Sequence, residues 1–177
     1  MDGNTSIDNV VKNVAIITGV LNKQIPIYRG MDGPIVATKA DASAYHGTDG
    51  FGNAQEKWLK AANTDNIKKE HAANAIITHV NEEYEKGNEV GIFTIGPMSN
   101  LAMALRLDPS IAEKIKHVYV MGGTVNGWGN ITGTAEFNFR CDPEAAKICI
   151  GTFKYIHLLP WETAYNFKVT KEGKFSN

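Results

Sequence analysis

The stretch Val90-Gly-Ile-Phe-Thr-Ile95, followed at once by Gly96-Pro97, decides the fold class of this chain. It is a short apolar run bounded by turn residues, which predicts a buried strand. The same pattern occurs twice more along the chain, in His117-Val-Tyr-Val-Met121 and Tyr155-Ile-His-Leu-Leu159. Strands of this kind, apolar on both faces, are typical of parallel sheets covered by helices.

Helical patterns separate the predicted strands. Thr5 and Asp8 fit a capping pattern for the first helix, and Asp142-Pro143 fits the start of the last. The predicted helices cover residues 5–22, about 67–84, 101–105, a short stretch from Pro109, and 144–150. Strands alternating with helices predict an α/β protein with a mostly parallel open sheet flanked by helices.

Three further segments complete the predicted order. Residues 24–28 form a weaker strand candidate, because Pro26 cannot donate a backbone hydrogen bond. Residues 29–64 and 122–140 are rich in glycine and small polar residues without a sustained period, which predicts long loops. Ligands of open α/β sheets bind beyond the carboxyl ends of the strands, so the segments after Tyr28, Ile95, Met121 and Leu159 are expected to gather on one rim.

Composition narrows the class of protein. The chain has 177 residues and a formal net charge of −1, which suits one globular domain and predicts no nucleic-acid partner. No apolar run reaches the length of a membrane span, and the residues after Met1 do not resemble a secretory signal. Cys141 and Cys149 are predicted to be buried free thiols, which indicates a reducing, cytoplasmic location.

Three segments contain candidate functional residues, and the residues of each segment also have a purely structural interpretation. His46 lies among Gly47, Gly50 and Gly52, which either aim the imidazole into a pocket or form an exposed turn. Residues 129–138 offer a carboxylate and two amides that suit a polyhydroxylated ligand, although the same residues serve turns and caps. The carbonyl of Ile95 either binds a hard cation or belongs to an ordinary turn.

Taken in order, these segments resemble the inosine-uridine-preferring nucleoside hydrolase family. The resemblance covers nearly the whole chain. It rests on Asp2-Gly-Asn-Thr5, His46-Gly-x-x-Gly-x-Gly52, Ile95-Gly-Pro-Met-Ser-Asn-Leu-Ala102, Val120-Met-Gly-Gly123, Ala135-Glu-Phe-Asn138 and Asp142-Pro-Glu-Ala-Ala146. It implies hydrolysis of the N-glycosidic bond of ribonucleosides, with a calcium ion that binds the ribose hydroxyls and the attacking water.

The resemblance also implies a role for each matching residue. The carbonyl of Ile95 would be a calcium ligand. His46 would be the catalytic residue on the base side, where its imidazole would hydrogen-bond to or stack on the departing base. The ribose pocket would consist of Asn4, Asn130, Glu136, Asn138, Met121 and Phe137. Within it, Glu136 would accept from the hydroxymethyl end, Asn138 would bind the sugar hydroxyls, and the other two asparagines would orient the nucleoside.

The chain also departs from the family pattern. The family's aspartate cluster is not found before Asp2, and no His-Asp pair follows later in the chain. Residues 1–177 are therefore expected to form a partial nucleoside hydrolase domain, with little or no activity alone and with homo-oligomers allowed. The alternatives are a non-catalytic nucleoside- or ribose-binding relative, and a product without any ligand. Trp161 or Glu162 is expected to line a pocket in a divergent subgroup.

Overall fold

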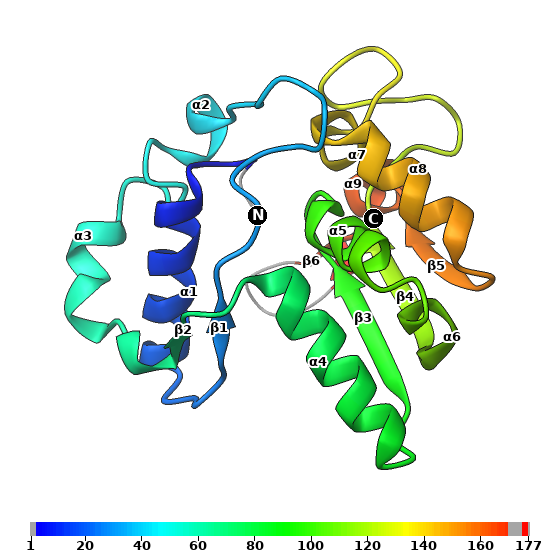
Figure 1. Cartoon of the computed structure of the whole chain (residues 1–177). Helices are drawn as coiled ribbons and strands as arrows, with labels where there is room; N and C mark the ends of the chain where they lie inside the picture. The colour runs from blue at the N-terminus through cyan, green and yellow to red at the C-terminus, as the bar shows by residue number, and fades with distance from the viewer. Residues whose placement is uncertain (1–2, 170–174, 177) are drawn as a thin grey trace.

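A three-stranded parallel sheet forms the centre of the larger part of the molecule (Figure 1). The computed structural model describes residues 3–169 and 175–176. Strands β3 (Val90–Thr94), β4 (Ile115–Met121) and β5 (Ile156–Leu159) lie in the order β3-β4-β5, and all pairs are parallel. The α/β fold with a mostly parallel sheet is confirmed.

The remaining described strands form separate pairs. β1 (Ile27–Tyr28) pairs in parallel with β2 (Ile67–Lys68), and β6 (Lys168–Val169) pairs antiparallel with β7 (Phe175–Ser176). In Figure 1, the β1–β2 pair lies with the long helix α1 on the left, away from β3–β5 on the right. The described parallel strands therefore make two sheets rather than one continuous sheet.

The helices connect and cover these strands. The α-helices are α1 (Ile7–Val20), α2 (Ser43–His46), α3 (Gln55–Trp58), α4 (Ala72–Glu85), α5 (Ser99–Leu107), α6 (Ile111–Lys114), α7 (Phe137–Cys141), α8 (Pro143–Thr152) and α9 (Trp161–Asn166). Short 3-10 helices span Leu59–Ala61 and Thr64–Asn66. Among the described residues, no helix combines the length and apolar character needed to cross a bilayer.

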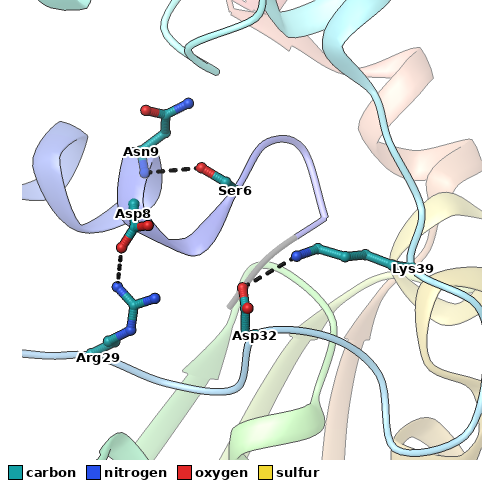
Figure 2. Close-up of polar contacts among 6 residues, drawn as sticks. All are labelled: Ser6, Asp8, Asn9, Arg29, Asp32 and Lys39. Atoms are coloured by element: carbon teal, nitrogen blue, oxygen red, sulfur yellow. Dashed lines mark hydrogen bonds and ion pairs between the residues drawn. The ribbon is translucent and has the colours of Figure 1, made fainter.

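Local capping and strand pairing explain where the element boundaries differ from the predictions. The first helix is capped by Ser6, which accepts from the backbone N–H of Asn9 at 3.3 Å (Figure 2), while the hydroxyl of Thr5 donates to the carbonyl of Thr48. The helix predicted from residue 67 is wrong over its first turn, because Ile67 and Lys68 pair with β1. Helix α4 begins at Ala72, and the side chain of His71 caps it by accepting from the backbone N–H of Ala73.

Three smaller expectations also change. Pro109 does not open a helix, because the Asp108 carboxylate accepts from Ser110 and α6 begins at Ile111. Both predicted loops contain short helices, α2 and α3 in the first and α7 at the end of the second, and α9 was not predicted. The cap at Asp142-Pro143 is confirmed, since Asp142 accepts from Ala145 at the start of α8.

The hydrophobic core lies between the sheet β3–β5 and helices α4, α5 and α8. Val118 and Val120 of β4 point into it and are almost completely buried. Both cysteines are buried free thiols, as predicted. Burial raises the pKa of the Cys149 thiol to about 12, so this thiol stays protonated and packs as a small apolar group.

One buried carboxylate ties the loop after β1 to the core. Besides capping α8, the Asp142 carboxylate accepts from the backbone N–H of Ile35 at 3.0 Å and from the hydroxyl of Ser99. Nearby, the side-chain oxygen of Asn100 accepts from the backbone N–H of Met31 at 2.8 Å. The loop therefore lies against the N-terminal ends of α5 and α8.

Replacing this carboxylate tests its role in the fold. Asp142→Ala removes an acceptor used by three donors and leaves buried N–H and O–H groups unsatisfied. We expect the free energy of unfolding to fall by about 3 kcal/mol or more in urea denaturation. The control Asp65→Ala, at an exposed position, is expected to change it by less than about 0.5 kcal/mol. Equal losses in the two variants would contradict this role.

Candidate active site

The carboxyl ends of the strands lead to one rim, as the sequence predicted. The bond from Met31 to Asn100 joins the segment after β1 to the segment after β3. On the other side, the backbone N–H of Gly122, just past β4, donates to the carbonyl of Leu159 at the end of β5. Segments that lie far apart in the sequence therefore meet where an α/β protein binds its ligand.

Glu136 is the most deeply embedded polar group on this rim. Its side chain is only 2% exposed. One carboxylate oxygen accepts from the backbone N–H groups of Gly123 (2.9 Å) and Phe139 (3.1 Å), and the other accepts from Asn138 (2.9 Å). A carboxylate has about four lone-pair sites, so the group retains room for one more donor. Glu136 therefore caps α7 and presents a fixed acceptor at the end of β4.

Glycine is required where this carboxylate meets the strand end. Gly123 has φ +70°, and a Cβ added to it would lie 3.0 Å from the ring of Phe139. Any other residue would strain the backbone and press on that ring. The glycine conformation therefore directs the N–H of residue 123 at Glu136.

Two asparagines join the same cluster. The side-chain oxygen of Asn130 accepts from the backbone N–H of Phe137 at 2.8 Å. The side-chain nitrogen of Asn138 donates to the carbonyl of Met121 at 3.1 Å and lies 3.3 Å from its sulfur. The structure thus brings together five of the predicted ribose-side residues, from β4, the loop after it and α7.

The other predicted residues lie around this cluster at different distances. Asn4 is exposed, and the adjoining Gly3 lies close to Phe137, since a Cβ added to Gly3 would be 3.8 Å from that ring. Ile95 directly follows β3 and is 83% exposed. With Met121 and Leu159 it lines a cavity of about 350 Å³ on the open face of the sheet.

His46 belongs to a different part of the rim. It ends α2 and packs edge-on against Tyr45, with ring centroids 4.9 Å apart. The loop that follows is fastened to α1, because the side chain of Asn13 donates to the carbonyl of Asp49 at 2.9 Å. Within residues 3–169, His46 makes no hydrogen bond or ring contact with Glu136. In Figure 1, helix α2, which His46 ends, lies on the side of α1, whereas α7 lies beside α8, so His46 lies apart from the predicted ribose-side cluster.

Aspartates in the N-terminal half of the chain form local ion pairs and hydrogen bonds. Asp8 forms an ion pair with Arg29, and Asp32 forms one with Lys39 at 3.2 Å (Figure 2). Asp41 accepts from the backbone N–H of Ser43 at 2.7 Å. In the ranges that the structure describes, no three His, Cys, Asp or Glu residues lie close enough together to hold a metal ion.

Glu162 anchors the glycine-rich loop from the opposite side. Its carboxylate accepts from the backbone N–H groups of Val125 (3.1 Å) and Asn126 (2.8 Å). The side chain is buried, while the ring of Trp161 lies beside Tyr165. The sequence predicted that Trp161 or Glu162 lines a pocket. It carried no signal that Glu162 would hold the loop, because its partners are backbone N–H groups 36 and 37 positions away.

This fold and rim define the class of protein. The chain belongs to the family of inosine-uridine preferring nucleoside hydrolases, whose sequence profile matches residues 1–175. It is 33% identical over 146 residues to the pyrimidine-specific ribonucleoside hydrolase RihB of Escherichia coli (strain K12 / DH10B). That match covers 82% of this chain and 44% of the relative, so the chain spans less than half the length of this relative.

Solved structures of nucleoside hydrolases superpose on this chain. An inosine-guanosine nucleoside hydrolase superposes with a TM-score of 0.82 at 29% identity, covering 95% of this chain and 52% of the other. The plant nucleoside hydrolase PpNRh1 superposes with a TM-score of 0.80 at 25% identity, covering 93% and 51%. The chain therefore has the nucleoside hydrolase fold over about half of those chains.

The Glu162 anchor predicts a response to acid. The backbone N–H of Asn126 in particular, with those of Val125 and Trp128, holds the pKa of the Glu162 carboxyl below its ordinary value of 4.5. A lowered pKa stabilises the folded loop above pH 4.5, and this stabilisation disappears as the pH falls through the folded pKa. We expect the amide signals of Val125 and Asn126 to shift together with a midpoint below 4.5 in an NMR titration.

Two variants check the assignment. Glu162→Gln is expected to abolish this shared transition and to speed amide exchange at Val125 and Asn126. Glu85→Gln, at an exposed helix end far along the sequence, is expected to leave the transition unchanged. A transition that survives in Glu162→Gln would show that another group controls the loop.

Proposed function

We propose that this chain carries the ribose-binding part of a ribonucleoside hydrolase, which cleaves the N-glycosidic bond of purine or pyrimidine nucleosides to ribose and free base. The observation that supports this most is the buried Glu136, held at the end of β4 beside the amides of Asn130 and Asn138. Membership of the nucleoside hydrolase family gives this polar cluster its substrate class.

The chemistry of the cluster suits a ribose. Sugar hydroxyls both donate and accept, and a carboxylate between two amides offers both functions. In this proposal Glu136 accepts from the hydroxymethyl end of the sugar through its remaining lone pair, and Asn138 binds the ring hydroxyls. Asn4 and Asn130 orient the nucleoside, while Met121 and Phe137 form the apolar wall against the sugar.

His46 takes the base side in the same proposal. Its loop is fixed to α1 through Asn13, so the imidazole is carried by an element separate from the one that carries Glu136. An imidazole can donate to a ring nitrogen of the base or pack against its face. This separation allows the sugar and the base to be held by different parts of the rim.

Calcium, which the family resemblance implies, does not fit the described residues. Calcium takes about six to eight oxygen ligands. Of the expected ligands only the carbonyl of Ile95 is present among the described residues, and no acidic cluster faces it. We therefore propose that the 177 residues alone have little or no hydrolytic activity.

Similar proteins act on both classes of base. One is named as pyrimidine-specific and another as an inosine-guanosine hydrolase, so the names of similar proteins divide between the two classes of base. Ribonucleosides as a class are the proposed substrates. It includes a cytoplasmic location, supported by the two buried free thiols, and a homo-oligomer, supported by apolar side chains such as Phe93 on the open sheet face.

Nucleoside binding is the direct test of the ribose-side cluster. We expect inosine and uridine to shift the backbone amides of Phe137 and Asn138 in NMR titrations, and free ribose to compete. Asn138→Ala is expected to weaken binding about tenfold, corresponding to about 1.4 kcal/mol. Asn126→Ala, with its exposed side chain on the same loop, serves as the matched control. Absence of binding by both nucleosides would remove the ribose site.

Turnover is tested separately. Release of hypoxanthine or uracil by the 177-residue chain is expected to equal the buffer blank even with millimolar calcium, and calorimetry is expected to show no tight calcium binding. In any longer form that carries an aspartate cluster, Glu136→Ala is expected to lower kcat/KM about 10- to 100-fold, because a hydrogen bond to a charged group contributes about 1.5–3 kcal/mol. Turnover with tight calcium binding by the short chain would overturn the proposed impairment.

A further inference from the structure

Two histidines lie side by side on the face of the sheet β3–β5 that points away from the hydrophobic core. His117 belongs to β4 and His157 belongs to β5. Tyr119 pairs in register with His157, and His117 lies two residues before Tyr119 on the same face of β4. This register brings Nε2 of His157 within 3.3 Å of Nδ1 of His117. Because His157 is exposed and His117 is half-buried, the pair is open to solvent.

A row of stacked rings fixes the orientation of His157. The ring of Tyr119 stacks on that of His157, with centroids 4.5 Å apart and planes inclined by 15°. Phe93 of β3 stacks on Tyr119 in turn, with centroids 4.5 Å apart and an inclination of 10°. The three rings come from residues that are cross-strand neighbours. Because the rings are already ordered, a ligand of His157 pays less conformational entropy to hold the imidazole in place.

The distance between the two ring nitrogens fits one metal ion. A Zn–N bond is about 2.0–2.1 Å long, so two nitrogens bound at a tetrahedral angle of about 109° lie about 3.3–3.4 Å apart. The observed separation is 3.3 Å. As a hydrogen bond between two nitrogens this distance is long, since N–H donors usually lie about 2.7–3.2 Å from their acceptors. An ion can therefore bind both nitrogens with little movement of either side chain.

The proton balance of this exchange is simple. In the hydrogen bond between His117 and His157, one ring donates an N–H and the other accepts through a lone pair. A bound ion needs a lone pair from both nitrogens. The donor ring meets this need by exchanging its proton through solvent to its other nitrogen, which is the second tautomer of a neutral imidazole. Both rings stay neutral, and no other reactant is required.

The type of ligand atom selects the class of metal. Imidazole nitrogen suits Zn²⁺, Cu²⁺ and Ni²⁺, whereas Ca²⁺ takes oxygen ligands. The cavity of about 350 Å³ that contains Ile95 is also lined by Tyr119 and His157, so there is room beside the pair for further ligands of the ion. The pair therefore differs in its chemistry from the calcium ligands that the family resemblance implies.

The charged groups near the pair compensate each other. Glu89, just before β3, forms an ion pair with Lys116 of β4. Bonding to Lys116, and to a smaller extent the charge of His117, holds the pKa of the Glu89 carboxyl below its ordinary value. A carboxylate is thus within electrostatic reach of His117, and it offsets the repulsion that Lys116 exerts on a dication.

We propose that His117 and His157 bind one divalent transition-metal ion of the zinc class, through Nδ1 of His117 and Nε2 of His157, with two water molecules completing a tetrahedron. The proposal goes beyond the proposed function, since neither a nucleoside nor calcium enters it. The open positions make this a site whose ion stays accessible to solvent, unlike a structural zinc site with four protein ligands.

Zinc binding is tested on the 177-residue chain without a purification tag, in buffer of about pH 7.5. Calorimetry with zinc chloride is expected to show saturable binding of one ion per chain. In NMR spectra the ring signals of His117 and His157 are expected to shift together, and calcium chloride is expected to leave both unchanged. Absence of saturation at about 1 mM zinc, or shifts confined to other histidines, would overturn the proposal.

Three variants locate the ion. His117→Gln and His157→Gln each remove one ligand and are expected to weaken zinc binding at least about tenfold, while their backbone amide spectra stay folded. His79→Gln, exposed on α4, serves as the matched control and is expected to change affinity less than about twofold. Unchanged affinity in His157→Gln, or a loss in His79→Gln, would place the ion elsewhere. One zinc ion per two chains would mean that a second copy replaces the waters, and it would overturn the open site.

Discussion

Asp142 is the side chain on which the arrangement of the rim depends. Backbone N–H groups of a loop cannot be buried without acceptors, and the loop after β1 meets this requirement through a carboxylate that is completely buried. The same carboxylate caps α8 and accepts from Ser99 at the start of α5. One acidic residue therefore fixes three segments whose positions define the carboxyl edge of the sheet.

Glu136 and Glu162 apply the same physical rule to the glycine-rich loop after β4. Glu136 accepts from the backbone N–H of Gly123 at the strand end, 13 positions away, and Glu162 of α9 accepts from that of Asn126, 36 positions away. A loop built from glycine and small polar residues has few apolar contacts of its own. Fixed carboxylate acceptors give it a defined shape, and that shape holds Asn130 and Asn138 around the proposed sugar site.

The division of the parallel strands into two sheets gives the site its layout. The predicted ribose-side cluster belongs to β4, the loop after it and α7, while His46 belongs to the part organised by α1. The two parts meet through the contacts of the loop after β1.

Apolar periodicity and ordered motifs are local properties of the chain, so they were sufficient to predict the class of fold and the family. They also pointed to the polar residues that gather after β4, whose ribose-side role stays a prediction. It did not predict that Ile67 and Lys68 form a strand, since that depends on pairing with β1. It did not predict Glu162 as an anchor, since its partners are backbone groups without a residue signature. These features, and the placement of His46 away from Glu136, come from the tertiary fold, because each depends on distances between residues far apart in the chain.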